Sequence, residues 1–330
     1  MARSDQVKAL VRSHREGDEQ RFRRTAEEII EDARRRRHGI LADELEAILD
    51  EPVRTQRPAK LATLRPLPKG RDDTSLLEIR QPDRTLHDVV LSPTTREVLM
   101  GLITEQRSAT ALHAYGIKPR RSVLFAGPSG TGKSATAEAI AGELGWPIAR
   151  VQLATVVSSY LGETAKNLDQ IFSFLQSGSW VLLFDEFDML ARDRGDRTDH
   201  GELKRVVGAL LQLIESTTTD SLIIATSNHP SLLDGALWRR FDEIVGFELP
   251  NSTERAALLD MKLHGVHHQL DTSVLAATMD GYSQADVESV ALDSIRLMVQ
   301  HLDHELSDQH VAYGIDRMEE RRRIIRNSQG

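Results

Sequence analysis

The sequence predicts an α/β protein in which helices cover a parallel β-sheet, followed by a helical subdomain. Three observations support this fold class. From residue 86 to residue 250, short apolar runs alternate with amphipathic helical stretches, as they do when helices join parallel strands. The segment GPSGTGKS (127–134) lies between an apolar run and a helical stretch, where a phosphate-binding loop belongs. After Pro250 only helical periodicity continues.

The composition is that of a folded protein. Of the 330 residues, 40% are hydrophobic and 28% are charged, which is close to the average for globular domains and excludes wholesale disorder. The absence of cysteine excludes disulfides, thiolate-ligated zinc, iron–sulfur clusters and cysteine nucleophiles, and suits a reducing compartment. We therefore expect a cytoplasmic protein.

Neither a membrane nor nucleic acid is an expected partner. No apolar run approaches the ~20 residues of a membrane-spanning helix, and the charged N-terminus offers no signal-peptide core. With 42 Lys and Arg against 50 Asp and Glu, the formal net charge is −8. A protein with this balance is not a general nucleic-acid binder, because the phosphate backbone attracts positive surfaces.

The first 85 residues divide into two parts. Residues 1–50 carry three apolar helical faces separated by Gly17 and Gly39, so we expect a small N-terminal helical bundle that binds a partner. Residues 51–85 hold four of the chain's 11 prolines within 17 positions. This pattern favours a partly extended, semi-stiff linker.

We expect the large domain over residues 86–250 and a helical lid over residues 251–330. Gly281 and Gly314 are the expected breaks between lid helices. Five apolar runs are the expected strands: Ser122–Ala126, Ile148–Gln152, Trp180–Phe184, Leu222–Thr226 and Glu243–Leu249.

Residues 127–134 match the pattern G-x4-G-K-[ST] of a phosphate-binding loop. The glycines let backbone N–H groups curl around a phosphate at a helix N-terminus, where the helix dipole also favours negative charge. Lys133 is expected to reach the β- and γ-phosphates, and the Ser134 hydroxyl to ligate Mg²⁺. A Gly-rich turn without a ligand is the less favoured alternative. The predicted nucleotide contacts are Gly127, Pro128, Ser129, Gly130, Thr131, Gly132, Lys133, Ser134 and Ala135.

An acidic pair, Asp185 and Glu186, directly follows the expected strand Trp180–Phe184. The carboxyl ends of parallel strands form the ligand-binding edge of such a sheet. Asp185 is therefore expected to bind nucleotide-associated Mg²⁺, and Glu186 to polarise the water that attacks the γ-phosphorus. A solvated strand end would be the alternative for an isolated pair, but the phosphate loop upstream favours the catalytic interpretation.

Two further segments carry polar residues suited to phosphoryl transfer. Asn228 follows the strand Leu222–Thr226, so its amide is expected beside the γ-phosphate position. Arg239 and Arg240 precede the last expected strand. Either could stabilise transition-state charge as an arginine finger, in its own subunit or in a neighbouring one.

Five ordered motifs make residues 86–300 resemble an AAA-family ATPase module. They are GPSGTGKS (127–134), FDEFD (184–188), ATSNHP (225–230), LLDGALWRRFD (232–242) and GYSQAD (281–286). The resemblance implies a P-loop αβα sandwich with a parallel five-stranded sheet in the order 5-1-4-3-2 and a C-terminal helical lid. It also implies ATP and Mg²⁺ as cofactors and assembly into a homo-oligomeric ring, usually a hexamer.

The same resemblance implies roles for single residues. Asn228 matches the first sensor, which positions the attacking water. Arg239 and Arg240 match the finger arginines that act on the nucleotide of the adjacent protomer. Because the segment lacks the usual Pro-Gly insertion, which of the two reaches across stays open. Gly281 and Asp286 match the second-sensor region, and we expect both to contact the nucleotide.

The segment Tyr160-Leu161-Gly162 resembles the aromatic–hydrophobic–glycine pore loop of protein-threading members. In that role Tyr160 and Leu161 would grip a polypeptide, and Gly162 would let the loop turn. Packing of Tyr160 at the entry of the following helix is the alternative. Residues 191–201 are charged and punctuated by glycine, so a second pore loop and an ordinary solvated loop are equally compatible with them.

Two groups of histidines on expected lid helices, in residues 264–268 and 301–305, have spacings that could chelate a metal. Neither follows the residue order of a zinc protease. We interpret both as surface groups.

These features predict a Mg²⁺- and ATP-dependent, ring-forming ATPase that remodels or unfolds a protein client. The pattern is similar to that of short bacterial AAA proteins encoded beside subtilisin-like proteases, so a subtilisin-like protease is a candidate partner. The alternative is a nucleotide-dependent binding or switch module, or a nucleic-acid-loading ATPase, that threads no polypeptide. The Tyr160-Leu161-Gly162 segment favours the first.

Overall fold

The computed structural model describes residues 25, 66–157, 161–190, 199–217, 219–232 and 238–328. The chain divides into two units, Met1–Pro58 and Ala59–Gly330, and the sheet and the helices around it lie in the second. Apart from residue 25, the predicted N-terminal bundle lies outside the described residues, as does the first part of the predicted linker.

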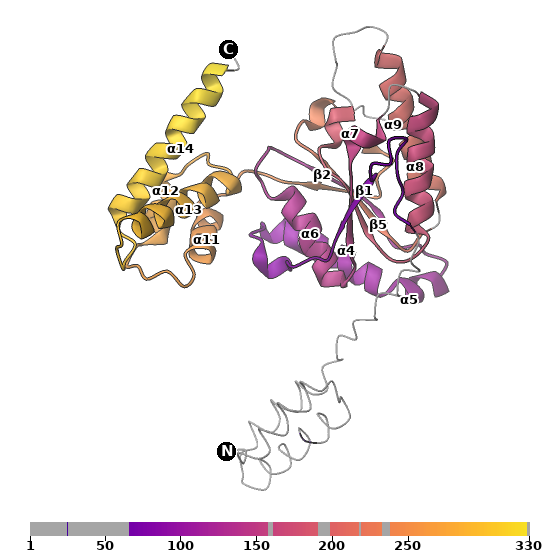
Figure 1. The fold of residues 1–330 in the computed structure, drawn as a ribbon. Coiled ribbons are helices and arrows are strands. Elements are labelled where there is room, and N and C mark those ends of the chain that lie inside the picture. The colour runs from indigo at the N-terminus through magenta and orange to yellow at the C-terminus, as the bar shows by residue number, and fades with distance from the viewer. Residues whose placement is uncertain are drawn as a thin grey trace. The chain divides into compact units, whose positions relative to one another are not determined.

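A six-stranded, mostly parallel sheet forms the centre of the second unit (Figure 1). Five strands arise from the predicted apolar runs, because strands covered on both faces are apolar almost throughout. The strands are β1 (Leu77–Arg80), β2 (Ser122–Ala126), β3 (Ile148–Val151), β4 (Val181–Phe184), β5 (Leu222–Ser227) and β6 (Glu243–Gly246). They lie in the order β1-β3-β4-β5-β2-β6.

Strand β1 corrects the predicted strand count, and it extends the predicted order 5-1-4-3-2 by one strand beside β3. It pairs antiparallel with β3 at one edge, with Leu77 opposite Val151, whereas β3, β4, β5, β2 and β6 are parallel to one another. It also lies within the range 51–85 that the sequence assigns to a linker. Leu76 and Leu77 are buried, so apolar burial holds this part of the chain on the sheet.

Helices cover both faces of the sheet. The helices of this part of the chain are α4 (Pro93–Arg107), α5 (Ala109–Ala114), α6 (Lys133–Leu144), α7 (Leu153–Val156), α8 (Leu161–Leu175) and α9 (Asp199–Ser216), with the short 3-10 helices η1 (Leu86–Asp88), η2 (Phe187–Leu190) and η3 (Pro230–Leu232). Neighbouring strand residues point to opposite faces. Val123 and Phe125 of β2 therefore pack in the apolar cluster of α4 and α6, whereas Leu124 packs in the cluster of α8 and α9.

After β6 the described chain continues in the helices α11 (Ser252–Lys262), α12 (Thr272–Thr278), α13 (Gln284–Gln300) and α14 (Asp308–Ser328), which we call the lid. Gly281, with a φ of 71°, separates α12 from α13. The predicted break at Gly314 is wrong, because this residue lies inside α14. A Cβ atom there would come within 2.7 Å of the Val290 carbonyl oxygen, so glycine lets α14 pack directly against α13.

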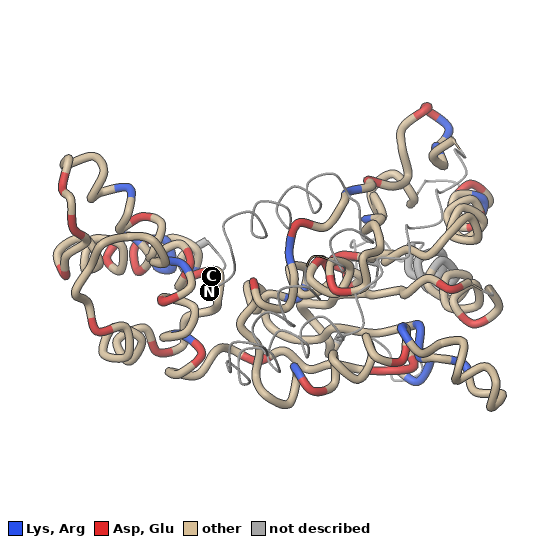
Figure 2. The backbone as a smooth tube through the Cα atoms, turned by 90° about the horizontal axis from the view of Figure 1, so that it is seen from below, with Lys and Arg blue, Asp and Glu red and all other residues tan. Residues whose placement is uncertain are grey.

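No helix among the described residues is long and apolar enough to cross a membrane. Acidic and basic residues are interspersed along the described backbone (Figure 2). Several of them form ion pairs between separate elements, such as Arg120 with Glu105 and Glu243.

Candidate active site

The phosphate loop follows β2 and runs directly against the lid. Gly130 and Gly132 have φ values of 76° and 85°, in the left-handed region that glycine adopts without strain. A Cβ atom at Gly130 would lie 2.6 Å from Ser283 Oγ, and one at Gly132 would lie 2.6 Å from Gln284 Oε1. The Ala285 N–H donates to the Gly130 carbonyl oxygen at 3.0 Å. The loop therefore needs glycine both for its turn and for its contact with the lid.

Lys133, the first residue of α6, is buried at the centre of this loop. Its Nζ donates to the carbonyl oxygens of Gly127 at 2.8 Å and of Pro128 at 2.6 Å. Burial lowers the pKa of Lys133 below its usual value, and the attraction of Asp185 offsets this only in part. An anionic ligand in the cavity would favour the charged form of this side chain.

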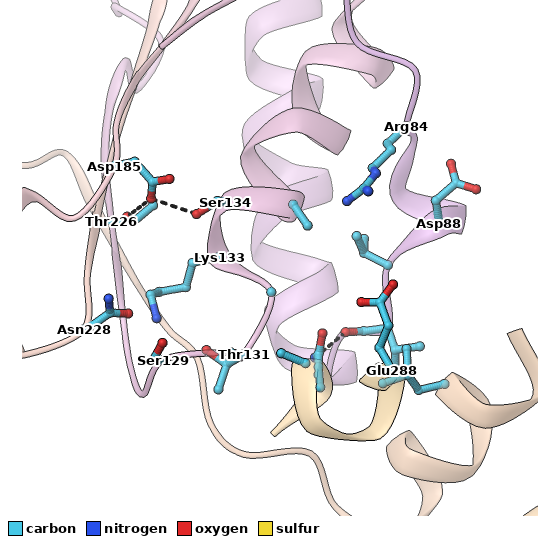
Figure 3. A pocket seen from close by; sticks show the side chains of 18 of the residues that line it. Arg84, Asp88, Ser129, Thr131, Lys133, Ser134, Asp185, Thr226, Asn228 and Glu288 are labelled. Carbon is cyan, nitrogen blue, oxygen red and sulfur yellow. Dashed lines mark hydrogen bonds between the residues drawn. The ribbon is translucent and has the colours of Figure 1, made fainter. Parts of the chain in front are cut away.

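Asp185 follows β4 and faces the loop (Figure 3). Its Oδ1 accepts hydrogen bonds from Ser134 Oγ at 2.7 Å and from Thr226 Oγ1 at 2.6 Å, and its Oδ2 accepts one from the Arg150 guanidinium. A hydroxyl and a carboxylate oxygen side by side are hard ligands of the kind that Mg²⁺ prefers. The donor set therefore fits the expected Mg²⁺.

Glu186 and Asn228 lie at neighbouring strand ends and line the same cavity as Lys133. Glu186 is exposed and has a φ of 53°, an uncommon left-handed conformation for a residue with a side chain. Its N–H donates to Thr226 Oγ1 at 3.0 Å. The Asn228 N–H donates to Oδ1 of the buried Asp188 at 3.0 Å, which fixes the loop that carries the amide.

The cavity brings together most of the residues predicted from the phosphate loop. Residues 129–135 line it with Asp185, Glu186 and Asn228, while Gly127 and Pro128 lie behind it as the acceptors of Lys133. The remaining lining residues were not assigned a role from the sequence. They are Arg84, Asp88, Val89, Val90, Thr226, Leu258, Lys262, Gln284, Ala285 and Glu288. Thr226, Gln284 and Ala285 lie inside the motifs at 225–230 and 281–286, whereas the others come from the segment before α4 and from the lid and carry no motif.

Gly281 and Asp286, the expected second-sensor residues, are not among the residues that line the cavity. Asp286 instead completes the N-terminal cap of α13, because its carboxylate accepts the Ser283 N–H at 2.9 Å. It also accepts a hydrogen bond from Arg322 of α14 at 3.2 Å. Any effect of Asp286 on a nucleotide therefore passes through the first turn of α13.

Arg239 and Arg240 also lie away from the cavity of their own subunit. Arg240 donates to both carboxylate oxygens of Glu215, at the end of α9, at 2.7 Å each. Arg239 is exposed. The two arginines therefore differ, since only Arg240 has an ion pair within the described part of the chain.

Tyr160 and the loop 191–198 lie outside the described residues. Leu161 and Gly162 are the first two residues of α8, and nothing lies within 4 Å of the position where a Gly162 Cβ would stand. The structure thus places part of the expected pore-loop segment at a helix start.

His301, Asp303 and His310 have side-chain atoms within 4.8 Å of one another, but hydrogen bonding argues against a metal there. His310 Nδ1 accepts the Ser307 N–H at 3.0 Å, so the proton of the neutral ring is on Nε2. That atom lies 2.9 Å from Asp303 Oδ2 and donates to it. The ring therefore has no lone pair left for a metal ion.

A glycine-rich loop between a buried strand and a helix, with a lysine, a serine and a carboxylate at its mouth, defines a P-loop nucleoside triphosphatase. Residues 123–249 match the family model described as ATPase family associated with various cellular activities (AAA). The chain is 40% identical over 301 residues to an uncharacterized AAA family ATPase of Sinorhizobium fredii, across 91% of this chain and 90% of that protein. The chain therefore belongs to the AAA family, and it is an ATP hydrolase.

Other relatives match over smaller parts. The chain is 32% identical to the ATP-dependent zinc metalloprotease FtsH 3 of Sphaerobacter thermophilus, across 77% of this chain and 53% of that protein. It is 33% identical to the cell division cycle protein 48 homolog of Archaeoglobus fulgidus, across 57% of this chain and 27% of that protein. The chain thus matches about half or less of these longer proteins.

Proposed function

We propose that the protein is a ring-forming, Mg²⁺-dependent ATPase that uses ATP hydrolysis to remodel or unfold a protein client. The observation that carries the proposal is the convergence of Lys133, Ser134, Asp185, Glu186 and Asn228 on one cavity that the lid also lines. Each of these side chains has the chemistry that phosphoryl transfer to water requires.

We assign one role to each residue at the cavity. Backbone N–H groups of residues 129–135 would surround the phosphates, and Lys133 would exchange its loop carbonyls for phosphate oxygens. Ser134 and Asp185 would hold Mg²⁺, which when bound neutralises phosphate charge. Glu186 accepts a proton from the attacking water, and Asn228 orients that water. Gly281 and Asp286 act indirectly, by shaping the first turn of α13.

A ring would bring an arginine of one subunit beside the nucleotide of the next, since neither Arg239 nor Arg240 lines the cavity of its own subunit. AAA-family proteins typically form rings, and we propose a homohexamer. Because Glu215 holds Arg240 within its own subunit, we assign the finger role to the exposed Arg239. Its guanidinium would stabilise transition-state charge on the nucleotide of the adjacent protomer.

The remodelling role is supported by the sequence Tyr160-Leu161-Gly162, which we propose as a chaperone-like pore loop that grips a polypeptide; Leu161 and Gly162 are the first residues of α8. One relative is named an ATP-dependent metalloprotease, which supports a link between this kind of module and proteolysis. We propose that residues 1–50 select the client, with a subtilisin-like protease as the candidate partner.

Client capture tests the proposal. Glu186→Gln should bind ATP without cleaving it and so retain a client, whereas Lys133→Ala should not bind ATP and serves as the matched control. The expected result is a protein that copurifies with Glu186→Gln in the presence of ATP and is absent from the control. A preparation dominated by nucleic-acid complexes would instead support the nucleic-acid-loading alternative.

A further inference from the structure

The carboxylate of Asp185 is engaged at both of its oxygen atoms. Oδ1 accepts the hydroxyls of Ser134 and Thr226 (Figure 3), and Oδ2 accepts the Arg150 guanidinium. The side chain of Asp185 is 11% exposed, and that of Arg150 is 48% exposed. Asp185 therefore already has a cationic partner within the chain, at the position where Mg²⁺ is expected to bind.

Arg150 reaches this position from within the sheet. It is the exposed residue of β3, between the buried Ala149 and Val151, and β3 pairs with β4, whose end carries Asp185. A guanidinium stays charged at every pH at which the protein is folded. Its charge beside Asp185 is therefore permanent.

We propose that Arg150 is a positioning residue that acts as the internal counter-ion of Asp185. It holds the carboxylate against Ser134 and weakens the binding of divalent cations to the nucleotide-free site. The inference rests on the proposed function, because it takes Ser134 and Asp185 as the Mg²⁺ ligands.

The charges around Asp185 explain why metal binding should depend on the nucleotide. Lys133 interacts electrostatically with Asp185, Asp188 and Glu186, and Arg150 contacts Asp185 directly. Two cations thus offset three carboxylates, and Arg84 and Lys262 of the cavity lining balance Asp88 and Glu288, which leaves one net negative charge for a free metal ion. The phosphates of ATP supply the missing charge, so the nucleotide-free site binds a divalent cation more weakly than the nucleotide-bound site.

A purely structural ion pair would behave differently from a counter-ion. Removing Arg150 from a structural pair lowers the stability of the fold and leaves metal affinity unchanged or weaker. Removing a counter-ion strengthens metal binding, because Asp185 loses a competing positive charge. The direction of the change in metal affinity separates the two roles.

The test uses Mn²⁺ alone as the probe, titrated into the nucleotide-free full-length protein and followed by the electron paramagnetic resonance signal of free Mn²⁺. Arg150→Gln should bind Mn²⁺ about tenfold more tightly than wild type, as expected when one unit charge is removed a few ångströms from the ion. Arg150→Met should give the same gain, because charge and not hydrogen bonding is responsible. Mn²⁺ affinity that is unchanged or weaker in whichever of these neutral variants folds would overturn the proposal.

Two controls make the result specific. Arg80→Gln removes an arginine from the neighbouring strand β1, where it pairs with Glu78, and should leave Mn²⁺ affinity at the wild-type value. Adding Asp185→Asn to Arg150→Gln should abolish the gain, and a gain that survives it would overturn the proposal.

A separate titration in the presence of ADP tests the site itself. Wild type should then bind Mn²⁺ more tightly, and Asp185→Asn should lose this binding. Failure here would contradict the proposed Mg²⁺ site, whereas success here with no gain in Arg150→Gln would contradict only the role of Arg150.

Discussion

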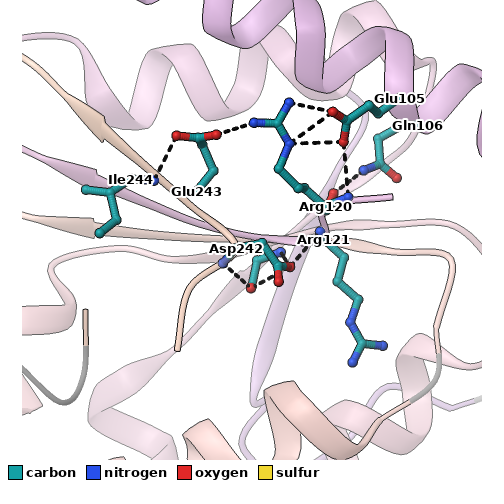
Figure 4. A network of polar contacts seen from close by, with 8 residues as sticks. Glu105, Gln106, Arg120, Arg121, Asp242, Glu243 and Ile244 are labelled. Atoms are coloured by element: carbon teal, nitrogen blue, oxygen red, sulfur yellow. Dashed lines mark hydrogen bonds and ion pairs between the residues drawn. The ribbon is translucent and has the colours of Figure 1, made fainter. Parts of the chain in front are cut away.

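The parallel sheet has charged residues at both ends of its strands, and these residues have different partners at the two ends. At the carboxyl ends of the strands, Lys133 contacts backbone carbonyl oxygens and Glu186 is exposed beside a cavity. At the opposite edge, where the parallel strands begin, Arg120 is paired with both Glu105 and Glu243 (Figure 4). We call these the nucleotide edge and the closed edge.

The closed edge joins segments that lie far apart in the sequence. Oδ2 of Asp242 accepts the N–H groups of Arg121 at 2.9 Å and Ser122 at 3.0 Å, which ties the start of β6 to the start of β2. The Arg121 guanidinium donates to the carbonyl oxygens of Ile214 at 3.0 Å and Glu215 at 2.9 Å, at the end of α9. Charges that are satisfied within the chain fix position, whereas charges that face a cavity remain available for a ligand.

The same difference exists between the adjacent residues Arg239 and Arg240, because Arg240 has an ion pair within the described part of its own chain and Arg239 has none there. Arg239→Ala should lower ATP turnover by about a thousandfold or more, because the finger stabilises transition-state charge. Arg240→Ala, the matched control, removes an exposed ion pair worth about 0–1 kcal/mol and should leave turnover within a few-fold of wild type. Steady-state ATPase assays on ring-forming preparations measure both. Equal losses in the two variants would show that the pair with Glu215 does not decide which arginine acts.

Substitution of Glu186 tests whether this residue of the nucleotide edge is the general base in its own subunit. Glu186→Gln should lower turnover by about 10²–10⁴-fold while ATP affinity is retained, because the base acts mainly in the transition state. The same substitution at the closed edge, Glu105→Gln, should leave turnover nearly unchanged. Single-turnover hydrolysis and nucleotide-binding assays separate the two effects. Near-normal hydrolysis by Glu186→Gln would exclude Glu186 as the base.

The buried Lys133 predicts a pH dependence of ATP binding. Burial lowers the pKa of Lys133 in the nucleotide-free protein, and bound phosphates raise it again because they favour the charged form. ATP affinity is therefore fully present below the nucleotide-free pKa and falls as the pH rises past it. Titration with a fluorescent ATP analogue over the alkaline range measures this decline. Lys133→Arg stays charged and should show a flatter profile, so an equally steep decline in that variant would point to another group.

The smallest expected effect lies at the closed edge. Hydrogen bonds from Arg120 lower the pKa of Glu105 below its ordinary value of 4.5. The stability from this pair is therefore present above pH 4.5 and is lost as the pH falls through the lowered pKa. Glu105→Gln should destabilise the fold by about 1 kcal/mol at neutral pH and by less in acid. Denaturant unfolding at several pH values measures this, and a cost independent of pH would mean that packing rather than charge is responsible.

Sequence patterns predicted the features that are local in the chain. Strand β2 has its predicted bounds because an uninterrupted apolar run ends at Gly127, where the loop turns. Strand β1 (Leu77–Arg80) was missed because it follows a proline-rich stretch that favours a linker, and because its pairing with β3 joins segments far apart in the sequence. Gly314 was expected to break a helix, but packing of α14 against α13 outweighed its local preference.

In the candidate site too, residues in sequence motifs were predicted, whereas residues placed by tertiary contacts were not. Lys133, Ser134 and Asp185 belong to motifs whose spacing is visible in the sequence. Arg150 carries no motif, and Gln284 lies in the motif at 281–286 without an assigned role. Their places in the site come from tertiary contacts, with Asp185 and with the Val90 carbonyl oxygen at 2.9 Å. Pairings between separate strands and between the lid and the large domain cannot be inferred from spacing along the chain.

The most direct test of the contrast between the two edges is complementation in mixed rings. Lys133→Ala lacks ATP binding but still offers Arg239, whereas Arg239→Ala binds ATP but lacks the finger. Equimolar mixing should restore part of the wild-type turnover, and adding Arg240→Ala to the Lys133→Ala subunit should leave the restored turnover nearly unchanged. The absence of rescue at every mixing ratio, with mixed rings demonstrated by pull-down of differently tagged subunits, would contradict the assignment of Arg239 to the neighbouring nucleotide.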